Sequence, residues 1–328
     1  MPRFDTLQTS LVCAVTGPSS ANRTDARWDV WGTDLGHMFE HNGREYMAFG
    51  DTYGRNRKHP RSNALALLAP ENDPNTGLTI ESMETDASGR ARQIIPNRLL
   101  HFEVTVIPTY GVSVGDRMYL HYMSVRRWLQ PGRWQLNHSG LAYSDDDGRT
   151  WRRAGGRRPG NSAFSQVAFV KANGFVYLFG IPAGRFGALK LARVQEDALL
   201  SPRLYEYWTG DVWSNDGEKA ATTLVPAPVG ELSVAWNSYY SRWLMMYLDE
   251  RTASIVLRTA DVLTGPWSEE RTVVTAEHYP QLYAPYITPR WNDGPEVYFT
   301  MSLFGSYNVF LMRTRLGQHA FERPSGES

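Results

Sequence analysis

The chain has 328 residues, a formal net charge of zero and 42% hydrophobic residues, enough for one sizeable core. A neutral chain lacks the long-range attraction of proteins that bind nucleic acid or anionic membranes, so we expect neither partner and favour a neutral substrate. Cys13 is the single cysteine, which excludes an intrachain disulfide. No signal peptide and no apolar run of about 18 residues is recognisable in the sequence.

The first predicted hairpin spans residues 32–54. Two strand-like segments, GTDLGHMFE and EYMAFGDTYG, flank an Asn-Gly pair, which is a strong hairpin signal. Facing residues of an antiparallel pair have a constant index sum, so pairing of Glu40 with Glu45 predicts that Asp34 faces Asp51. Like charges in that position are destabilising, which indicates that the pair has a function.

The same strand-turn-strand pattern recurs at residues 106–124, 164–180, 230–250 and 284–302. A more polar pair of strands separates successive copies. Five repeats of about four antiparallel strands predict an all-β, five-bladed β-propeller. The spare strand LVCAVT at 11–16 would complete the last blade beside YNVFLMRTRL and close the ring, which removes exposed sheet edges. We expect a single propeller domain over residues 1–322 and a loose tail at 323–328.

Acidic residues also mark the open end of the fourth hairpin. A pairing of Trp236 with Trp243, within one position, places Glu231 opposite Leu248 or Asp249. The innermost strands of a propeller surround its axis, so residues at the same end of different blades converge on one central pocket. Because the first and fourth blades are not neighbours in a ring of five, we expect the two sets of acids to face each other across that pocket.

The corresponding ends of the other blades carry Tyr110, Tyr283 and Arg185. Aromatic faces stack on sugar rings while carboxylates bind their hydroxyls, so this wall suits a sugar. Turn capping or a bound cation is the alternative role of the acids, which leaves a structural calcium ion open. The eight histidines show no metal-ligand spacing, and we expect no other metal or cofactor. Segments 55–60 and 126–133 are long enough to raise walls beside an open groove.

Other motifs predict packing rather than chemistry. The Asp box SDDDGRTW at 144–151 and the DVLTGPW segment at 261–267 are interpreted as tight turns whose tryptophans pack between strands. His37, His121 and His138 lie in strand-like segments, where a satisfied structural histidine is expected. Phosphate-binding, dinucleotide-binding and G-x-S-x-G motifs are absent from the sequence, which argues against nucleotide chemistry.

Several segments together resemble the endo-D-arabinanases of glycoside hydrolase family 183, long catalogued as a domain of unknown function. The resemblance extends from Trp28 to Leu316 and rests on GTDLG, FGDTYG, SGLAYSDDDGRTW, FGIPAGRFGALKLARV, VGELSVAWN, LRTADVLTGPWS and SYNVFLMRTRL. It implies a five-bladed propeller that cuts internal α-linked D-arabinofuranose bonds in mycobacterial arabinogalactan and lipoarabinomannan, with Asp34 and Asp51 as leading catalytic candidates. Members occur in actinobacteria and their phages, so action on the cell wall, outside the cell or at phage lysis, is expected.

Glycoside hydrolysis needs one carboxylic acid and one carboxylate. We take Asp34 and Asp51 as the essential pair and Glu231 as the next candidate for acid or base. The expected substrate-binding residues are Asp249, Arg185, Tyr110, Tyr283 and Trp28. Two other functions stay open: a sialidase-like exo-glycosidase, which needs an arginine cluster to hold a carboxylate, and a non-catalytic carbohydrate-binding propeller such as a phage or cell-wall lectin module.

Overall fold

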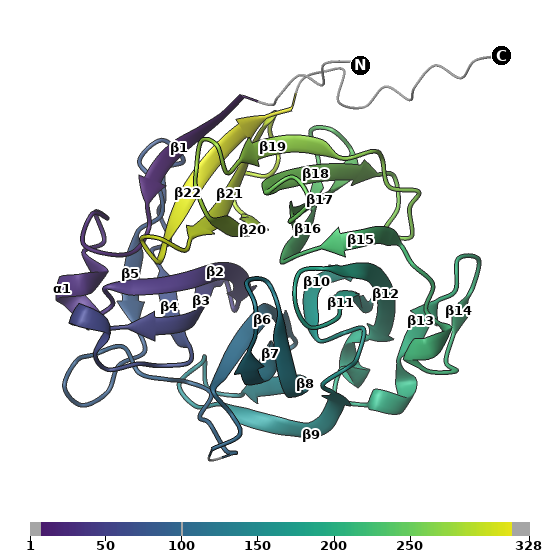
Figure 1. Ribbon diagram of the computed structural model, residues 1–328, viewed down its shortest axis with the longest axis horizontal. Coiled ribbons are helices and arrows are strands. Elements are labelled where there is room, and N and C mark those ends of the chain that lie inside the picture. Colours follow the sequence, from purple (N-terminus) through teal and green to yellow (C-terminus); the bar gives the residue numbers. More distant parts are fainter. Residues whose placement is uncertain (1–7, 100, 317–328) are drawn as a thin grey trace.

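Five antiparallel sheets radiate from a common axis in the computed structural model, which describes residues 8–99 and 101–316 (Figure 1). The predicted five-bladed propeller is therefore confirmed. Blade 1 consists of β2 (Gly32–His41), β3 (Arg44–Tyr53), β4 (Ala64–Leu68) and β5 (Ile80–Met83). Blade 2 consists of β6 (Thr105–Val114), β7 (Arg117–Trp128), β8 (Trp134–Ser144) and β9 (Arg152–Pro159).

Blade 3 is enlarged relative to the predicted repeat. It consists of β10 (Gln166–Ala172), β11 (Phe175–Ile181), β12 (Gly187–Gln195), β13 (Glu206–Trp208) and β14 (Trp213–Ser214), and β15 (Val225–Val229) also pairs with β12. Blade 4 consists of β16 (Leu232–Asn237), β17 (Arg242–Asp249), β18 (Ser254–Ala260) and β19 (Arg271–Thr275). Helical segments are short: α1 (Thr24–Trp28), η1 (Arg55–Arg57), η2 (Glu196–Ala198), η3 (Pro202–Leu204) and η4 (Glu218–Ala220).

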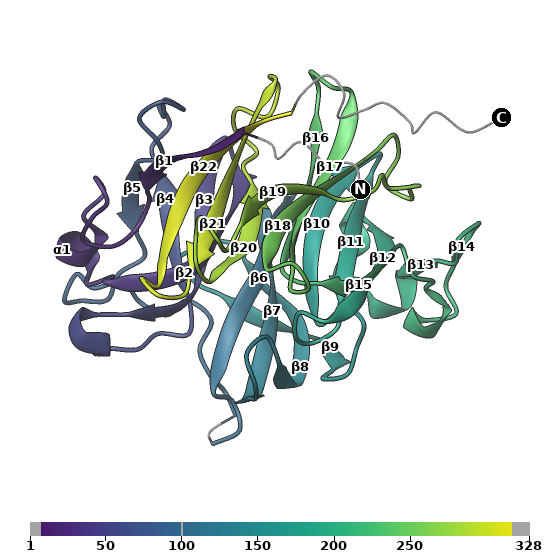
Figure 2. The same cartoon turned by 45° about the horizontal axis from the view of Figure 1, so that its top comes forward.

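Blade 5 joins the two ends of the described chain. It consists of β20 (Leu282–Ile287), β21 (Glu296–Leu303), β22 (Asn308–Arg315) and, from the N-terminus, β1 (Gln8–Ala14). β1 runs antiparallel to β22, from Gln8 opposite Arg315 to Ala14 opposite Phe310, and both views show the two strands side by side (Figure 2). The predicted closing strand is thus confirmed, and it covers the edge that β22 would otherwise expose.

The innermost strands β2, β6, β10, β16 and β20 form the ring around the axis, each in contact with the next. Their side chains alternate between the two faces of each blade, so the space between neighbouring blades fills with apolar residues. Phe49, Phe164, Phe179 and Phe299 are fully buried there. Packing between all five blades therefore fixes the positions of the inner strand ends, where the candidate site lies.

The Asp box occupies the turn between β8 and β9, away from the axis. Asp146 accepts hydrogen bonds from the backbone N and Oγ1 of Thr150, and Trp151 Nε1 donates to Gly148 O at 2.9 Å. Trp267 likewise packs edge-on against Phe179, with ring centroids 6.0 Å apart. Both motifs have the structural roles that the sequence predicts.

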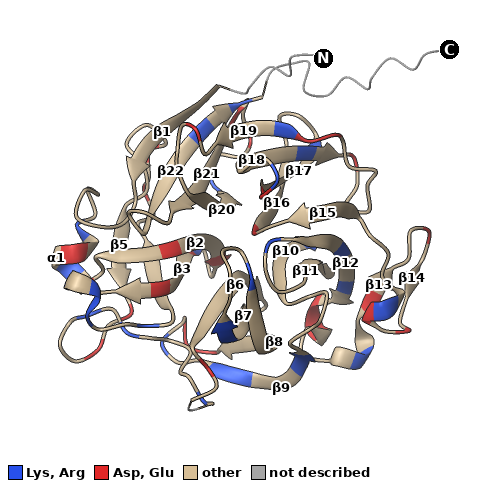
Figure 3. Ribbon diagram, viewed as in Figure 1, with Lys and Arg blue, Asp and Glu red and all other residues tan. Residues whose placement is uncertain are grey.

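Acidic and basic residues are distributed over all five blades, in keeping with the zero net charge (Figure 3). Among the described residues no helix is long and apolar enough to span a membrane. The loose tail expected at 323–328 lies outside the described residues.

Candidate active site

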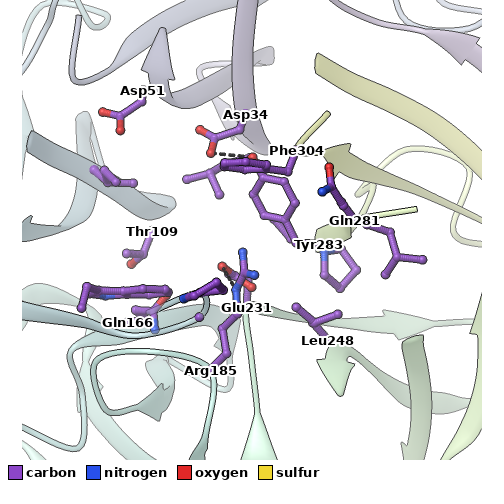
Figure 4. Close-up of a pocket in the computed structure, with 18 of the residues that line it drawn as sticks. Asp34, Asp51, Thr109, Gln166, Arg185, Glu231, Leu248, Gln281, Tyr283 and Phe304 are labelled. Atoms are coloured by element: carbon purple, nitrogen blue, oxygen red, sulfur yellow. Dashed lines mark hydrogen bonds and ion pairs between the residues drawn. The ribbon is translucent and has the colours of Figure 1, made fainter. Parts of the chain in front are cut away.

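A cavity of about 820 Å³ lies at one end of the propeller axis, where all five blades contribute to its wall (Figure 4). The predicted residues Asp34, Asp51, Tyr110, Arg185, Glu231 and Tyr283 all line it. In Figure 4, Asp34 and Asp51 lie on one side, and Glu231 with Arg185 lies on the other. Blades that are not neighbours therefore present carboxyl groups to the same space.

Asp34 is buried in the wall beneath two tyrosines. Its Oδ2 accepts hydrogen bonds from Tyr283 Oη at 2.8 Å and Tyr307 Oη at 3.1 Å. Its Oδ1 is buried and has no partner among the described residues. Burial, and to a lesser extent the charge of Asp51, raises the pKa of Asp34 to about 7 despite the two tyrosine bonds. Asp34 is therefore a carboxyl group that still holds a proton at neutral pH.

The strand pairing around Asp34 differs from the regular register that the sequence suggests. Glu40 does face Glu45, but β-bulges interrupt the ladder, so that Asp34 alone lies opposite both Gly50 and Asp51. Leu35 and Gly36 then adopt left-handed φ values of 69° and 75°. Bulges redirect side chains and are common beside active sites. Here the bulges set Asp34 against the backbone of Gly50 rather than directly across from Asp51.

Asp51 is the second acid of this hairpin. It accepts a short hydrogen bond from Thr105 Oγ1 on β6, which ties blade 1 to blade 2. Burial raises the pKa of Asp51 to about 6, and the threonine bond opposes that rise. Asp51 is consequently ionised over more of the neutral range than Asp34. One acid and one carboxylate can coexist on this hairpin near pH 6 to 7.

Glu231 lies across the cavity and is held by Arg185. Arg185 Nε donates to Glu231 Oε1 at 2.9 Å, and its Nη1 approaches Glu250 Oε1 at 3.1 Å. The same guanidinium lies 4.9 Å from the ring centroid of Tyr283. Glu231 Oε2 is buried and has no partner among the described residues. Arg185 thus orients Glu231 through one carboxylate oxygen and leaves the other uncommitted.

Aromatic groups and a histidine complete the wall. Tyr110 stacks on His37 with ring centroids 5.7 Å apart, and Tyr286 lies 5.2 Å from Tyr110. Burial lowers the pKa of His37 to about 3, so its imidazole is neutral. Its Nε2 has no partner in the described part of the chain. The expectation that His37 is a satisfied structural residue is wrong, because it lines the cavity with a free ring nitrogen.

Two expected substrate-binding residues do not line the cavity. Leu248 faces Glu231, which is one of the two predicted registers. Side chains alternate along a strand, so Leu248 and Glu250 face the cavity while Asp249 points away from it. Asp249 is fully buried and pairs with Arg251, whose Nη2 lies 2.7 Å from its Oδ2. Trp28 belongs to α1 at the periphery, where Arg27 lies 3.9 Å from its ring centroid.

Sequence reasoning did not select Glu250, which pairs with Arg185, or Tyr307, which donates a hydrogen bond to Asp34. Alternation from Leu248 could have identified Glu250, which lies two positions further along the chain. Tyr307 lies in the turn between β21 and β22, and its link to Asp34 depends on ring closure. The predicted wall segments are at the rim of the cavity, represented by Arg57 and by residues 128–133.

Gly50 is required by the close approach of Asp34. A Cβ atom at position 50 would overlap Asp34 Oδ1, and Leu35 Cδ1 would lie 3.1 Å from it. Tyr283 and Tyr307 hold Oδ2 of Asp34, so Oδ1 cannot move away from the added methyl group without straining these bonds. We therefore expect Gly50→Ala to displace the carboxyl group. If Asp34 is a catalytic acid, the variant should lose at least about tenfold in activity, equivalent to about 1.4 kcal/mol. Gly43→Ala is the control for general destabilisation: position 43 has open space but a left-handed φ of 71°. Equal activity losses in the two variants would contradict this role of Gly50.

Relatives identified by sequence include two fungal proteins. The chain is 30% identical over 305 residues to notoamide biosynthesis cluster protein J of Aspergillus sp. (strain MF297-2). The alignment covers 84% of this chain and 80% of that protein. It is 30% identical over 293 residues to notoamide biosynthesis cluster protein J' of Aspergillus versicolor, with coverages of 82% and 79%.

Solved structures share the propeller fold at low sequence identity. A putative hydrolase from Bacteroides ovatus aligns with a TM-score of 0.62 at 14% identity, covering 89% of this chain and 88% of that one. An exo-β-1,3-galactanase from Phanerochaete chrysosporium gives 0.57 at 8% identity, with coverages of 95% and 65%. A family 117 glycoside hydrolase from Zobellia galactanivorans gives 0.52 at 10% identity, with coverages of 97% and 93%. A family model described as a domain of unknown function (DUF4185) matches residues 19–313, and the chain therefore belongs to this family.

Proposed function

We propose that this protein is an endo-acting glycoside hydrolase that cleaves α-linked D-arabinofuranose bonds in mycobacterial arabinogalactan and lipoarabinomannan. The observation that carries the proposal is the meeting of Asp34, Asp51 and Glu231 around one cavity, with buried, unpartnered oxygens on Asp34 and Glu231. Glycoside hydrolysis requires carboxyl groups that flank the cleaved bond. The choice of arabinan is based on the sequence resemblance, and the glycoside hydrolases among the fold relatives are consistent with a carbohydrate substrate.

Asp34 is the best candidate for the general acid. Its pKa of about 7 keeps a proton available at neutral pH, and its Oδ1 has no competing partner among the described residues. The proton passes from Asp34 to the glycosidic oxygen as the bond to the anomeric carbon breaks. The hydroxyl groups of Tyr283 and Tyr307 remain as hydrogen-bond donors that stabilise the resulting carboxylate. Burial and the neighbouring charge of Asp34 raise the pKa of both tyrosines, so neither loses its proton.

The second carboxylate comes from Asp51 beside Asp34 or from Glu231 across the cavity. Either can attack the anomeric carbon or take a proton from the water that does so. Asp51 also acts on Asp34 directly, because its negative charge contributes to the raised pKa of Asp34. Asp34 thus has one proposed role, and substitution of Asp51 and of Glu231 decides which of them supplies the second carboxylate.

The charges in the cavity favour a neutral sugar over the sialic acid of the sialidase alternative. Arg185 is already held by Glu231 and Glu250. Arg57 and Arg133, the other arginines of the wall, lie over the rings of Tyr53 and Phe186 at 5.5 and 4.2 Å. Binding of a carboxylate needs several arginines directed at one point. Neutral arabinan has no carboxylate and needs no such arginine cluster.

Incubation with mycobacterial arabinogalactan tests the proposal. We expect early products to form a ladder of short arabino-oligosaccharides, because an endo-acting enzyme cuts the polymer in mid-length. Chromatography of the products at low conversion distinguishes this ladder from a single monosaccharide. Release of sialic acid from a sialoglycan would favour the sialidase alternative, and arabinan binding without any cleavage would favour the lectin alternative.

The rate of cleavage should follow a bell-shaped pH profile with its maximum between about pH 6 and 7. Below pH 6 Asp51 becomes protonated, and above pH 7 Asp34 loses the proton it must donate. Measurement of kcat/KM on arabinan from pH 4 to 9 checks both limbs. A profile that stays flat to pH 9 would rule out Asp34 as the acid.

A further inference from the structure

The hairpin between β7 and β8 presents two tryptophans at the cavity rim. Trp128, the last residue of β7, faces Trp134, the first residue of β8, and their rings meet edge to face with centroids 5.7 Å apart. Trp128 is 44% exposed, whereas Trp134 is 8% exposed, and both line the cavity. A large exposed indole supported by a buried one forms a rigid, partly apolar surface beside the acids.

Trp134 adds a polar group to this surface. Its Nε1 is buried and has no acceptor among the described residues. An indole N–H can only donate, and leaving a buried donor without a partner is costly. A ligand that places a hydroxyl or ring oxygen at this point would remove the penalty. The hairpin therefore combines an exposed aromatic face, on which a sugar ring can stack, with one N–H group that can donate a hydrogen bond to a sugar oxygen.

The same hairpin is linked to the proposed catalytic residues. Gly132 O accepts a hydrogen bond from the backbone N of Arg185 at 2.9 Å, and the Arg185 side chain holds Glu231. On blade 5, Phe304 is 57% exposed and lies beside Gln281, near Asp34 and Tyr283 (Figure 4). Blades 2 and 5 are not neighbours in the ring, so these aromatic groups lie on different sides of the cavity.

We propose that the hairpin from Trp128 to Trp134 is a distal sugar subsite, which binds a furanose of the polymer away from the bond that is cleaved. The polymer then crosses the acids from blade 2 toward Phe304 and Gln281 on blade 5. This inference rests on the proposed function and deepens it, because a chain that extends beyond the acids on both sides must be cut internally. The subsite contributes binding energy without touching the reacting atoms.

Substitution of the two tryptophans tests the subsite. We expect Trp128→Ala to raise KM for arabinan by about tenfold while kcat changes less than about twofold, because the contact is lost equally in the ground and transition states. Trp134→Phe keeps the packing but removes the N–H, and should raise KM about threefold. Both variants should also shift the sizes of the earliest oligosaccharide products. Trp128→Phe keeps an aromatic face and should restore most of the affinity.

The matched control is Trp236→Ala. Trp236 is 41% exposed and pairs across strands with Trp243 at 5.3 Å, but it does not line the cavity. Its substitution should leave KM and the product pattern unchanged. Equal KM values and product patterns for wild type, Trp128→Ala and Trp134→Phe would overturn the subsite, even if arabinan is cleaved. Failure of the proposed function has a different signature, namely no cleavage by the wild type.

Binding provides a second readout that does not need catalysis. Asp34→Asn protein should be retarded in a native gel containing arabinan, and addition of Trp128→Ala should abolish much of that retardation. Undiminished retardation of the double variant overturns the subsite. Loss of retardation supports it, provided that thermal melting shows a folded protein.

Discussion

Asp34→Asn and Asp51→Asn should each reduce arabinan cleavage by about 10³-fold, within the range expected when a general acid or its partner is removed. Asparagine cannot deliver a proton to the glycosidic oxygen at position 34, and at position 51 it carries no charge. Its side-chain oxygen can still accept the bonds from Tyr283 and Tyr307, or from Thr105. The variants should therefore fold normally, and initial rates of reducing-end release measure the loss. Activity near that of the wild type in both variants would remove this pair from the chemistry.

Stability should change in the opposite direction to activity. Burial raises the folded-state pKa of Asp34 to about 7 from an ordinary value of 3.8, so the folded protein binds this proton more tightly than the unfolded chain. Stability is then lost as pH rises between these two values, because Asp34 must ionise in a buried site. Asp34→Asn avoids that cost and should melt several degrees above the wild type at pH 8. The difference should vanish near pH 4.

Glu231→Gln should reduce kcat on arabinan by about 10² to 10³-fold, because Glu231 lines the cavity across from Asp34 and its Oε2 has no partner among the described residues. Glutamine keeps the size of the side chain and an oxygen that can accept the bond from Arg185 Nε. A selective loss of kcat therefore reports the missing carboxylate rather than lost packing. Steady-state kinetics at the pH optimum provide the measurement.

Glu250→Gln is the matched control for Glu231→Gln. Glu250 accepts a hydrogen bond from Nη1 of the same guanidinium, and its proposed role is to hold Arg185 in place. Its substitution should reduce kcat by no more than about tenfold. If both glutamine variants lose the same activity, the two carboxylates act only through Arg185. If Glu231→Gln alone is strongly impaired, Glu231 contributes its own carboxylate to the reaction. Addition of azide or formate to Glu231→Gln provides a further test, because a small anion can replace a missing carboxylate.

Local sequence patterns determined most of the fold. Asn-Gly turns, period-2 alternation and the fivefold recurrence of one hairpin define the blades, because turn chemistry and side-chain alternation act over a few residues. The same patterns predicted that β1 closes the ring, and they predicted the partner of Trp236 to within one position, which the structure shows to be Trp243. They also brought Asp34, Asp51 and Glu231 to the same end of the propeller, because inner strands of successive blades share one direction relative to the axis.

Only the tertiary structure decided how the side chains point at that end. The bulges beside Asp34 break the constant index sum, and alternation turns Glu250 rather than Asp249 toward the cavity. Tyr307 reaches Asp34 across 273 residues because ring closure sets blade 5 against blade 1. Bulges, close approach and blade-to-blade packing depend on contacts between residues distant in sequence, and burial by those contacts raises the pKa of Asp34. The sequence thus located the acids, whereas packing around the axis determined their environment.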